Sequence, residues 1–203
     1  MKVLTFGEIM LRLKTPEYLR IVQADGFEAS YGGAESNVAV SLASFGDEAA
    51  FVTKLPENPV GEAALNELRR YGVDTSLVLK GGPRLGIYYF EKGTNIRPTN
   101  VVYDRAGSSI SVADSSEFDW EKLLSGIGIF YFSGVTPAIS DSIAKAVEEA
   151  LIYCHAHHIQ VVCDLNYRSK MWSCEKAQSV MKKLMRYVDL CIANDEEDRK
   201  SVV

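Results

Sequence analysis

The sequence lacks long apolar runs and any excess of positive charge. No stretch approaches the ~18 consecutive apolar residues of a membrane-spanning helix, and the N-terminal apolar run is too short for a signal peptide. Lys and Arg number 22 against 27 Asp and Glu, so no cationic surface is expected to attract nucleic acid or anionic lipid. We therefore expect a cytoplasmic protein that binds neither nucleic acid nor membranes.

Cysteine is also scarce, and its spacing excludes a structural zinc site. The four cysteines lie in the last quarter of the chain and form no CxxC pair: Cys154, Cys163, Cys174 and Cys191. We expect them to be reduced and mostly buried. The three histidines of residues 155–158 lie where a helix is expected to end, and cations are favoured there by the helix dipole. We interpret them as a solvated helix end and not as metal ligands.

What the sequence does contain is enough apolar material for a core, at 47% of 203 residues. Apolar runs of strand length alternate with segments of helical period, a pattern typical of an α/β protein with a parallel sheet. Asn58 is expected to cap a helix that has Pro59 at its first position. The expected strands cover residues 2–6, 48–54, 128–132, 159–163 and 188–193, and the expected helices cover 36–45, 59–71, 141–154 and 175–187.

Two segments break this alternation. About residues 10–30 and 85–111 alternate apolar and polar positions, which favours antiparallel strands. Paired with each other, they would form a small sheet that covers one end of the main sheet as a lid. No flexible linker is present, so we expect a single domain, residues 1–203, in which lid and core move together.

A glycine pair, Gly32 and Gly33, leads directly into the helix expected from residue 36. Glycine allows a ligand to approach the backbone, and the free N–H groups at a helix start favour bound oxygens. A purely structural turn explains the pair as well. A dinucleotide site is less favoured, because no GxGxxG follows the first strand.

Polar residues follow two expected core strands. Asp164-Leu-Asn166-Tyr-Arg168 comes after one strand and Asn194-Asp-Glu-Glu197 after the last. In open α/β sheets ligands bind at the carboxyl ends of strands, so the first group is a candidate site, with a solvated loop as the alternative. The oxygen ligands of the second group suit hydrated Mg²⁺, and ordinary helix capping is its alternative.

The second lid segment carries Tyr88, Tyr103 and Arg105. A guanidinium can grip a carboxylate through two hydrogen bonds, and neighbouring phenols can fix hydroxyl groups. The alternative is a strand face without a ligand.

Taken together and in order, these motifs resemble the PfkB, or ribokinase-like, carbohydrate kinases. The resemblance rests on residues 32–39 followed by Gly46 and Gly61, on the DxNxR pattern of 164–168, and on the NxxE pattern of 194–197. Within that family, residues 7–13, 54–59 and 103–108 are similar to 2-keto-3-deoxygluconate kinases. The resemblance implies a Rossmann-type, mostly parallel sheet flanked by helices, with a small β lid that is a candidate surface for a homodimer.

The resemblance also implies an activity, the transfer of a phosphoryl group from ATP to a hydroxyl of 2-keto-3-deoxygluconate or a related sugar acid. Arg168 would contact the substrate and the transferred phosphoryl group. Asn194 and Glu197 would organise ATP and Mg²⁺, with Glu197 acting on the metal indirectly. The residues implied to line the sugar site are Gly33, Asn37, Tyr88, Tyr103, Arg105, Asn166 and Arg168.

One departure from the family bears on catalysis. The GAGD motif, which carries the family's anion-hole glycines and catalytic aspartate, is absent from these residues. We expect the chain to correspond to the N-terminal two-thirds of the family, truncated at its C-terminus, and to be inactive by itself. The alternatives are an inactive sugar-binding or dimerising fragment and a kinase for another sugar such as fructose.

Overall fold

The computed structural model describes residues 1–194, and its centre is a five-stranded parallel sheet in the order β11-β10-β9-β1-β4. All four residues of β1 are buried, as expected for a central strand of a sheet covered on both faces. The strands are β1 (Val3–Phe6), β4 (Ala49–Val52), β9 (Ile129–Ser133), β10 (Gln160–Asp164) and β11 (Leu190–Ile192). The parallel sheet predicted from the sequence is therefore confirmed.

Two apolar layers hold helices against this sheet. Alternate residues of β4 point to opposite faces: Ala50 and Val52 join one apolar cluster, whereas Ala49 and Phe51 join the other. The first cluster is completed by α3 (Trp120–Leu123), α4 (Asp141–Ala156) and α5 (Cys174–Leu184), and the second by α1 (Ala34–Phe45) and α2 (Pro59–Arg70). No helix within residues 1–194 is long and apolar enough to cross a membrane.

Local signals placed the long helices well. The Asn58 side chain accepts hydrogen bonds from the N–H groups of Val60 and Gly61 and caps α2, with Pro59 at the first helical position. Ser140 caps α4 in the same way. The expected start of α1 at residue 36 was wrong, because the helix begins at Ala34, directly after the glycine pair. The last predicted helix ends earlier as α5, and a 3₁₀ turn, η3 (Met185–Tyr187), follows it.

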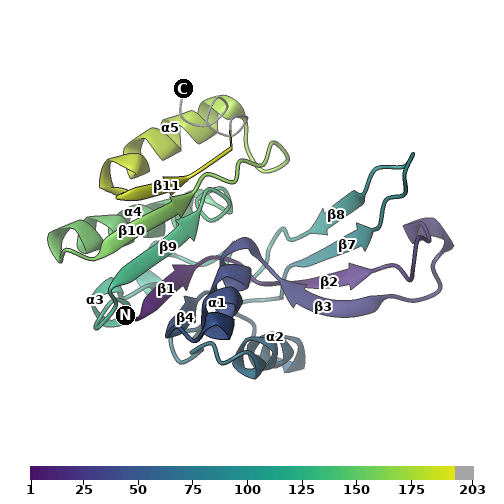
Figure 1. Cartoon of the computed structure of the whole chain (residues 1–203), viewed down its shortest axis with the longest axis horizontal. Coiled ribbons are helices and arrows are strands. Elements are labelled where there is room, and N and C mark those ends of the chain that lie inside the picture. Colours follow the sequence, from purple (N-terminus) through teal and green to yellow (C-terminus); the bar gives the residue numbers. More distant parts are fainter. Residues whose placement is uncertain (195–203) are drawn as a thin grey trace.

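The lid is a separate four-stranded sheet in the order β3-β2-β7-β8, which projects from the carboxyl ends of the main strands (Figure 1). Each segment forms an antiparallel pair as expected, and the parallel pairing of β2 with β7 joins the two pairs. The strands are β2 (Met10–Lys14), β3 (Glu28–Gly32), β7 (Ile87–Glu91) and β8 (Asn100–Asp104). The remaining elements are η1 (Ile21–Gln23), β5 (Lys54–Leu55), β6 (Leu79–Lys80) and η2 (Ser115–Glu117).

None of the four cysteines, all of which the structure describes, forms a disulfide, and only two of them are buried. Cys154 and Cys163 lie in the core, whereas Cys174 is half-buried and Cys191 is exposed on the edge strand. The expectation of mostly buried cysteines was therefore wrong for the edge strand. Among residues 1–194 no group of His, Cys, Asp and Glu is arranged to hold a metal ion.

Candidate functional site

A cleft of about 640 Å³ lies between the lid and the carboxyl ends of the main sheet. Ligand sites of small molecules typically occupy ~300–1,000 Å³, so the cleft can take a sugar. Its walls come from the start of α1, from the lid strands β2, β7 and β8, from the loop after β9, and from the loop after β10 (residues 166–171). These segments meet because parallel strands all end at the same edge of the sheet.

The structure brings together all the residues that the sequence assigned to the sugar site. They lie around this one cleft although they come from three distant parts of the chain: Gly33, Asn37, Tyr88, Tyr103, Arg105, Asn166 and Arg168. Their roles as substrate contacts are still predictions. The sequence did not indicate several neighbours that also line the cleft: Met10, Val101, Val135, Tyr167, Ser169, Lys170 and Met171.

Gly33 lies where the start of α1 approaches the loop after β1 most closely. It is the N-cap of α1, and a Cβ atom at this position would lie 1.9 Å from the carbonyl oxygen of Glu8. Its φ of −173° is ordinary extended backbone, so glycine is needed here for space and not for an unusual conformation. The glycine therefore lets the start of α1 approach the loop after β1.

The loop after β10 forms the opposite wall. Asn166 adopts a left-handed conformation with a φ of 37°, a conformation that asparagine tolerates better than most residues. The loop then presents Arg168, which is exposed and forms no ion pair within the described part of the chain. Lys170 donates a hydrogen bond of 3.2 Å to the carbonyl oxygen of Val101 in β8. This contact joins the core side of the cleft to the lid.

Two tyrosines from adjacent lid strands form an aromatic wall. Tyr88 and Tyr103 are direct neighbours in the β7–β8 pairing, and their ring centroids are 5.9 Å apart. Burial raises the pKa of Tyr88, and the nearby Arg12 offsets this only in part. The Tyr88 phenol therefore stays protonated near neutral pH and can donate a hydrogen bond to a ligand.

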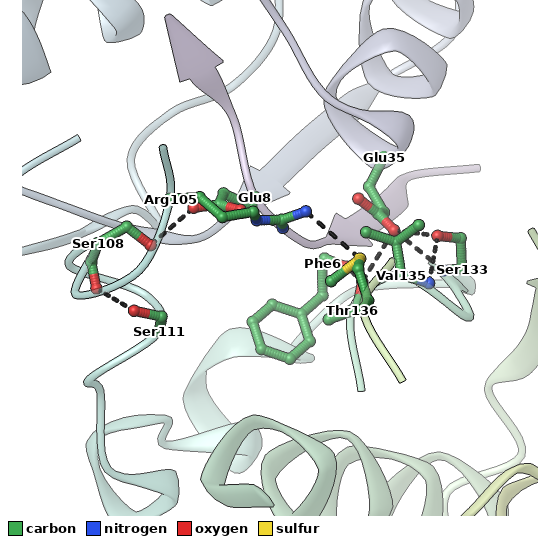
Figure 2. A network of polar contacts seen from close by, with 10 residues as sticks. Phe6, Glu8, Glu35, Arg105, Ser108, Ser111, Ser133, Val135 and Thr136 are labelled. Atoms are coloured by element: carbon green, nitrogen blue, oxygen red, sulfur yellow. Dashed lines mark hydrogen bonds and ion pairs between the residues drawn. The ribbon is translucent and has the colours of Figure 1, made fainter. Parts of the chain in front are cut away.

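Arg105 has a charged partner inside the protein. Its guanidinium forms an ion pair with Glu8, whose side chain is only 3% exposed, and it also contacts the Met171 sulfur at 3.4 Å (Figure 2). The Ser108 hydroxyl donates to the other oxygen of Glu8 at 2.7 Å. The sequence analysis missed Glu8, and the only signal was a lone charge between Gly7 and Ile9 in an apolar run. The two cleft arginines thus differ, because among the described residues only Arg105 has a counter-ion.

A second buried carboxyl group lies under the other side of the cleft. Glu35 on α1 reaches across to Ser133 at the end of β9 and to Thr136 in the following loop (Figure 2). Thr136 in turn lies 2.9 Å from the carbonyl oxygen of Phe6 in β1. These contacts hold the start of α1, the end of β9 and the end of β1 together. The sequence analysis did not predict them.

Of the two residues proposed for ATP and Mg²⁺, the structure describes only Asn194. Asn194 is exposed and follows the carboxyl end of β11, so it faces the side on which the cleft opens. Glu197 lies outside the described residues. The residues that the structure describes at this edge thus offer Asn194 as one oxygen donor for a phosphate or a hydrated cation.

Comparison with known proteins decides the family. The model of the pfkB family carbohydrate kinases matches residues 1–201. The chain belongs to this family. It is 38% identical, over 98% of its length, to the 2-dehydro-3-deoxygalactonokinase of Haloferax volcanii, of which it covers 62%.

Solved structures of sugar and sugar-acid kinases share the fold. The crystal structure of the 2-dehydro-3-deoxygluconokinase from Thermotoga maritima aligns with a TM-score of 0.97 at 52% identity, over 98% of this chain and 61% of that one. A sugar kinase of Pyrococcus horikoshii in complex with ATP aligns with a TM-score of 0.85 at 22% identity, over 96% and 64%, which is a likeness of fold. The chain thus spans less than two thirds of the length of these relatives.

Proposed function

We propose that the protein is an ATP-dependent kinase that phosphorylates a hydroxyl group of a 2-keto-3-deoxy sugar acid, the gluconate or the galactonate form. One observation carries the proposal: two arginines, Arg105 and Arg168, converge with two tyrosines on a cleft of sugar size. The carboxylate of an anionic sugar can pair with Arg168, next to Arg105 with its partner Glu8, whereas a neutral sugar such as fructose offers Arg168 no charge. The names of the Haloferax volcanii and Thermotoga maritima relatives, which are 38% and 52% identical to this chain, support the same substrate class.

Each cleft residue has a distinct part in this proposal. Arg168 is exposed, and its guanidinium is free to grip the carboxylate or to face the transferred phosphoryl group. Arg105 adds a second positive group whose orientation Glu8 fixes. Phosphoryl transfer depends chiefly on positioning and on charge stabilisation, so residues that hold the sugar in place contribute directly to the rate.

The nucleotide belongs beside the sugar cleft, at the same carboxyl edge of the sheet. We assign Asn194 and Glu197 to the phosphates of ATP and to its hydrated Mg²⁺, because Mg²⁺ prefers oxygen ligands and retains several waters. Bound Mg²⁺ would neutralise charge on the transferred phosphoryl group. We place this reaction in the cytoplasm, where ATP is available.

Calorimetric titration of the 203-residue chain tests the substrate class. We expect 2-keto-3-deoxygluconate to bind and fructose to bind much more weakly. A hydrogen bond to a charged group contributes ~1.5–3 kcal/mol, so Arg168→Ala should weaken binding of the sugar acid by about 10- to 150-fold. Arg70→Ala is the matched control, because this exposed arginine of α2 is not among the cleft residues. Equal affinity for fructose and the sugar acid would contradict the proposal.

We also propose that two copies associate through their lids. The lid exposes apolar side chains that a monomer leaves in water, among them Val22 at 89%, Ile96 at 97% and Val102 at 46%. Val102 lies on the face of β8 opposite to Tyr103, away from the cleft. Sedimentation should show a dimer, and Val102→Lys should weaken it. Ile152→Lys is the control, because Ile152 is an exposed residue of α4 outside the lid, and this substitution should leave the dimer unchanged. A monomer at every concentration would refute this arrangement.

A further inference from the structure

Glu35 is a carboxyl group for which the reaction has no direct use. It is the second residue of α1, it is 1% exposed, and one of its oxygens, Oε1, makes all its side-chain hydrogen bonds with other residues in the described part of the chain. The N–H of Ser133 lies 3.2 Å from Oε1, the Ser133 hydroxyl donates to it, and the Thr136 hydroxyl lies 2.8 Å away (Figure 2). Four heteroatoms thus meet at a single buried point.

A count of hydrogens at Thr136 indicates the protonation state. Its hydroxyl has one hydrogen but two oxygen neighbours, the carbonyl oxygen of Phe6 at 2.9 Å and Oε1 of Glu35. The carbonyl oxygen can only accept, and an ionised carboxylate can only accept. If Glu35 were ionised, the single hydroxyl hydrogen of Thr136 would have to serve both contacts. If Glu35 is protonated, it donates to Thr136 and Thr136 donates to Phe6.

Ser133 does not alter this count. Its hydroxyl accepts from the N–H of Val135 at 3.1 Å and uses its own hydrogen toward Glu35. It therefore has no free hydrogen for another acceptor. Only a hydroxyl oxygen on Glu35 can accept from Ser133 and donate to Thr136 at the same position.

The other oxygen supports the same conclusion. Oε2 of Glu35 is buried and has no hydrogen-bond partner among residues 1–194. It lies on the side of Gly7, where a Cβ atom would come within 2.1 Å of it. In a carboxylate, an unpaired buried oxygen would hold about half of the negative charge without contact with water. In a neutral acid, the unpaired carbonyl oxygen has no formal charge, so its burial costs less. Burial accordingly raises the pKa of Glu35, and its hydrogen bonds with Ser133 and Thr136 offset this only in part.

We propose that Glu35 is a neutral carboxylic acid in the folded protein, and that it donates a hydrogen bond to Thr136 that joins the start of α1 to the loop after β9. Both joined segments are walls of the cleft. Gly33 and Asn37 flank Glu35 on α1, and Val135 lies between its partners in the loop. Glu35 is therefore a positioning residue for the sugar, a role that rests on the function proposed above.

Other titratable groups around Glu35 need to be distinguished from it. Strand β9 contributes Tyr131, and burial, followed by the charge of Asp164, raises the pKa of that phenol. Strand β10 contributes Cys163 and Asp164, and burial is the first cause that raises the pKa of the Cys163 thiol. The loop after β1 contributes Glu8 with its partner Arg105. A pH effect is assigned to Glu35 only if a substitution of Glu35 abolishes it.

Infrared spectroscopy with ¹³C-labelled glutamate tests the protonation state without any substrate. At a pH at which exposed glutamates are ionised, the wild-type chain should show the band of a protonated glutamate carboxyl. Glu35→Gln should remove this band, and Glu62→Gln should leave it unchanged, because the interaction of Glu62 with Arg69 holds its pKa low. Absence of the band in the wild-type chain would overturn the proposal.

Thr136→Val determines the direction of the hydrogen bond and does not depend on whether Glu35→Gln folds. If Glu35 donates to Thr136, loss of the acceptor destabilises the neutral acid and lowers the pKa of Glu35. If Thr136 instead donates to a carboxylate, its loss raises that pKa. A titration of the labelled band distinguishes the two, and a rise would overturn the proposal.

Unfolding and binding as functions of pH test the positioning role. Because the folded-state pKa of Glu35 lies above its unfolded-state value, the folded protein holds one extra proton between them, and stability falls as the pH rises through the folded-state pKa. Sugar-acid affinity of the wild-type chain should fall over the same range, and Glu35→Gln should abolish both trends. Affinity that is independent of pH while the band titrates would refute the positioning role. No binding of the sugar acid at any pH would refute the proposed function and leave the infrared result standing.

Discussion

Substitution of Gly33 by alanine would act at the point where α1 meets the loop after β1. The added Cβ would lie 1.9 Å from the carbonyl oxygen of Glu8, whereas an ordinary contact is 3.4–4 Å. The two backbones must therefore separate by about 1.5 Å, since the obstacle is backbone and not a flexible side chain. Overpacking of this kind costs about 1–3 kcal/mol, which is a factor of about 5 to 150 in the folding equilibrium.

The same displacement would disturb the cleft from both sides. It moves Glu8, which orients Arg105, and it moves the helix turn that carries Asn37. A misplacement of ~1 Å can lower the rate of a positioned reaction by ~10²-fold, so we expect binding of the sugar acid to weaken by at least ~10-fold. Urea unfolding measures the stability, and calorimetry measures the affinity.

Gly26→Ala is the matched control for this substitution. A Cβ atom at Gly26 would have no heavy atom within 4 Å, and its φ lies outside the left-handed region. We expect its unfolding free energy to stay within about 0.5 kcal/mol of wild type or to rise slightly. If Gly33→Ala behaves like Gly26→Ala in both measurements, the close approach does not matter and the reasoning fails.

Arg105→Ala should lower the unfolding free energy by about 2–4 kcal/mol, because it leaves the Glu8 carboxylate buried without its cation, and adding Glu8→Gln should restore part of the loss. A double variant no more stable than the single one would contradict this pairing. Burial raises the pKa of Asp74, but hydrogen bonds from Lys2 and Ser76 outweigh burial and lower this pKa to about 2. The contribution of Asp74 to stability is therefore present above its ordinary pKa of 3.8 and is lost as the pH falls toward 2. After solvent screening this amounts to at most about 1 kcal/mol; Lys2→Ala should flatten the dependence of the unfolding free energy on acid pH, and an unchanged dependence would count against the pair. A protein made of residues 1–203 alone should release ADP from ATP, Mg²⁺ and the sugar acid no faster than a no-protein control, because a positioned base contributes ~10²- to 10⁴-fold and each anion-hole donor ~10²- to 10³-fold. Turnover retained through repurification would mean that another carboxylate, for example Asp164, serves as base.

Features with a local physical cause could be predicted from the sequence. Asn58 followed by Pro59 marked the start of α2, and Ser140 marked the start of α4, because a cap depends on the few residues around it. Two of the cleft residues could be predicted for a related reason, whereas Asn37 was implied by the family resemblance. Polar residues that follow buried strands, such as Asn166 and Arg168, must meet at one edge once the sheet is parallel.

The two buried carboxyl groups could not be found in this way. Glu8 contacts Arg105, 97 residues away, and Glu35 contacts Ser133, 98 residues away. Nothing in the sequence near either glutamate indicates its partner, because that contact exists only after the lid and the sheet have packed. The short helix α3 was missed for a different reason, since four residues are too few to show a helical period.

The parallel pairing of β2 with β7 has a consequence for how the lid folds and for how it could be exchanged. Leu11 pairs with Ile87, so the centre of the lid depends on a contact between residues 76 positions apart. Each outer pair is a two-stranded ribbon, which is at best marginally stable alone in water. Such distant contacts form slowly because a long loop must close first. An exchange of lids between family members would therefore have to replace both segments, 10–32 and 87–104, together.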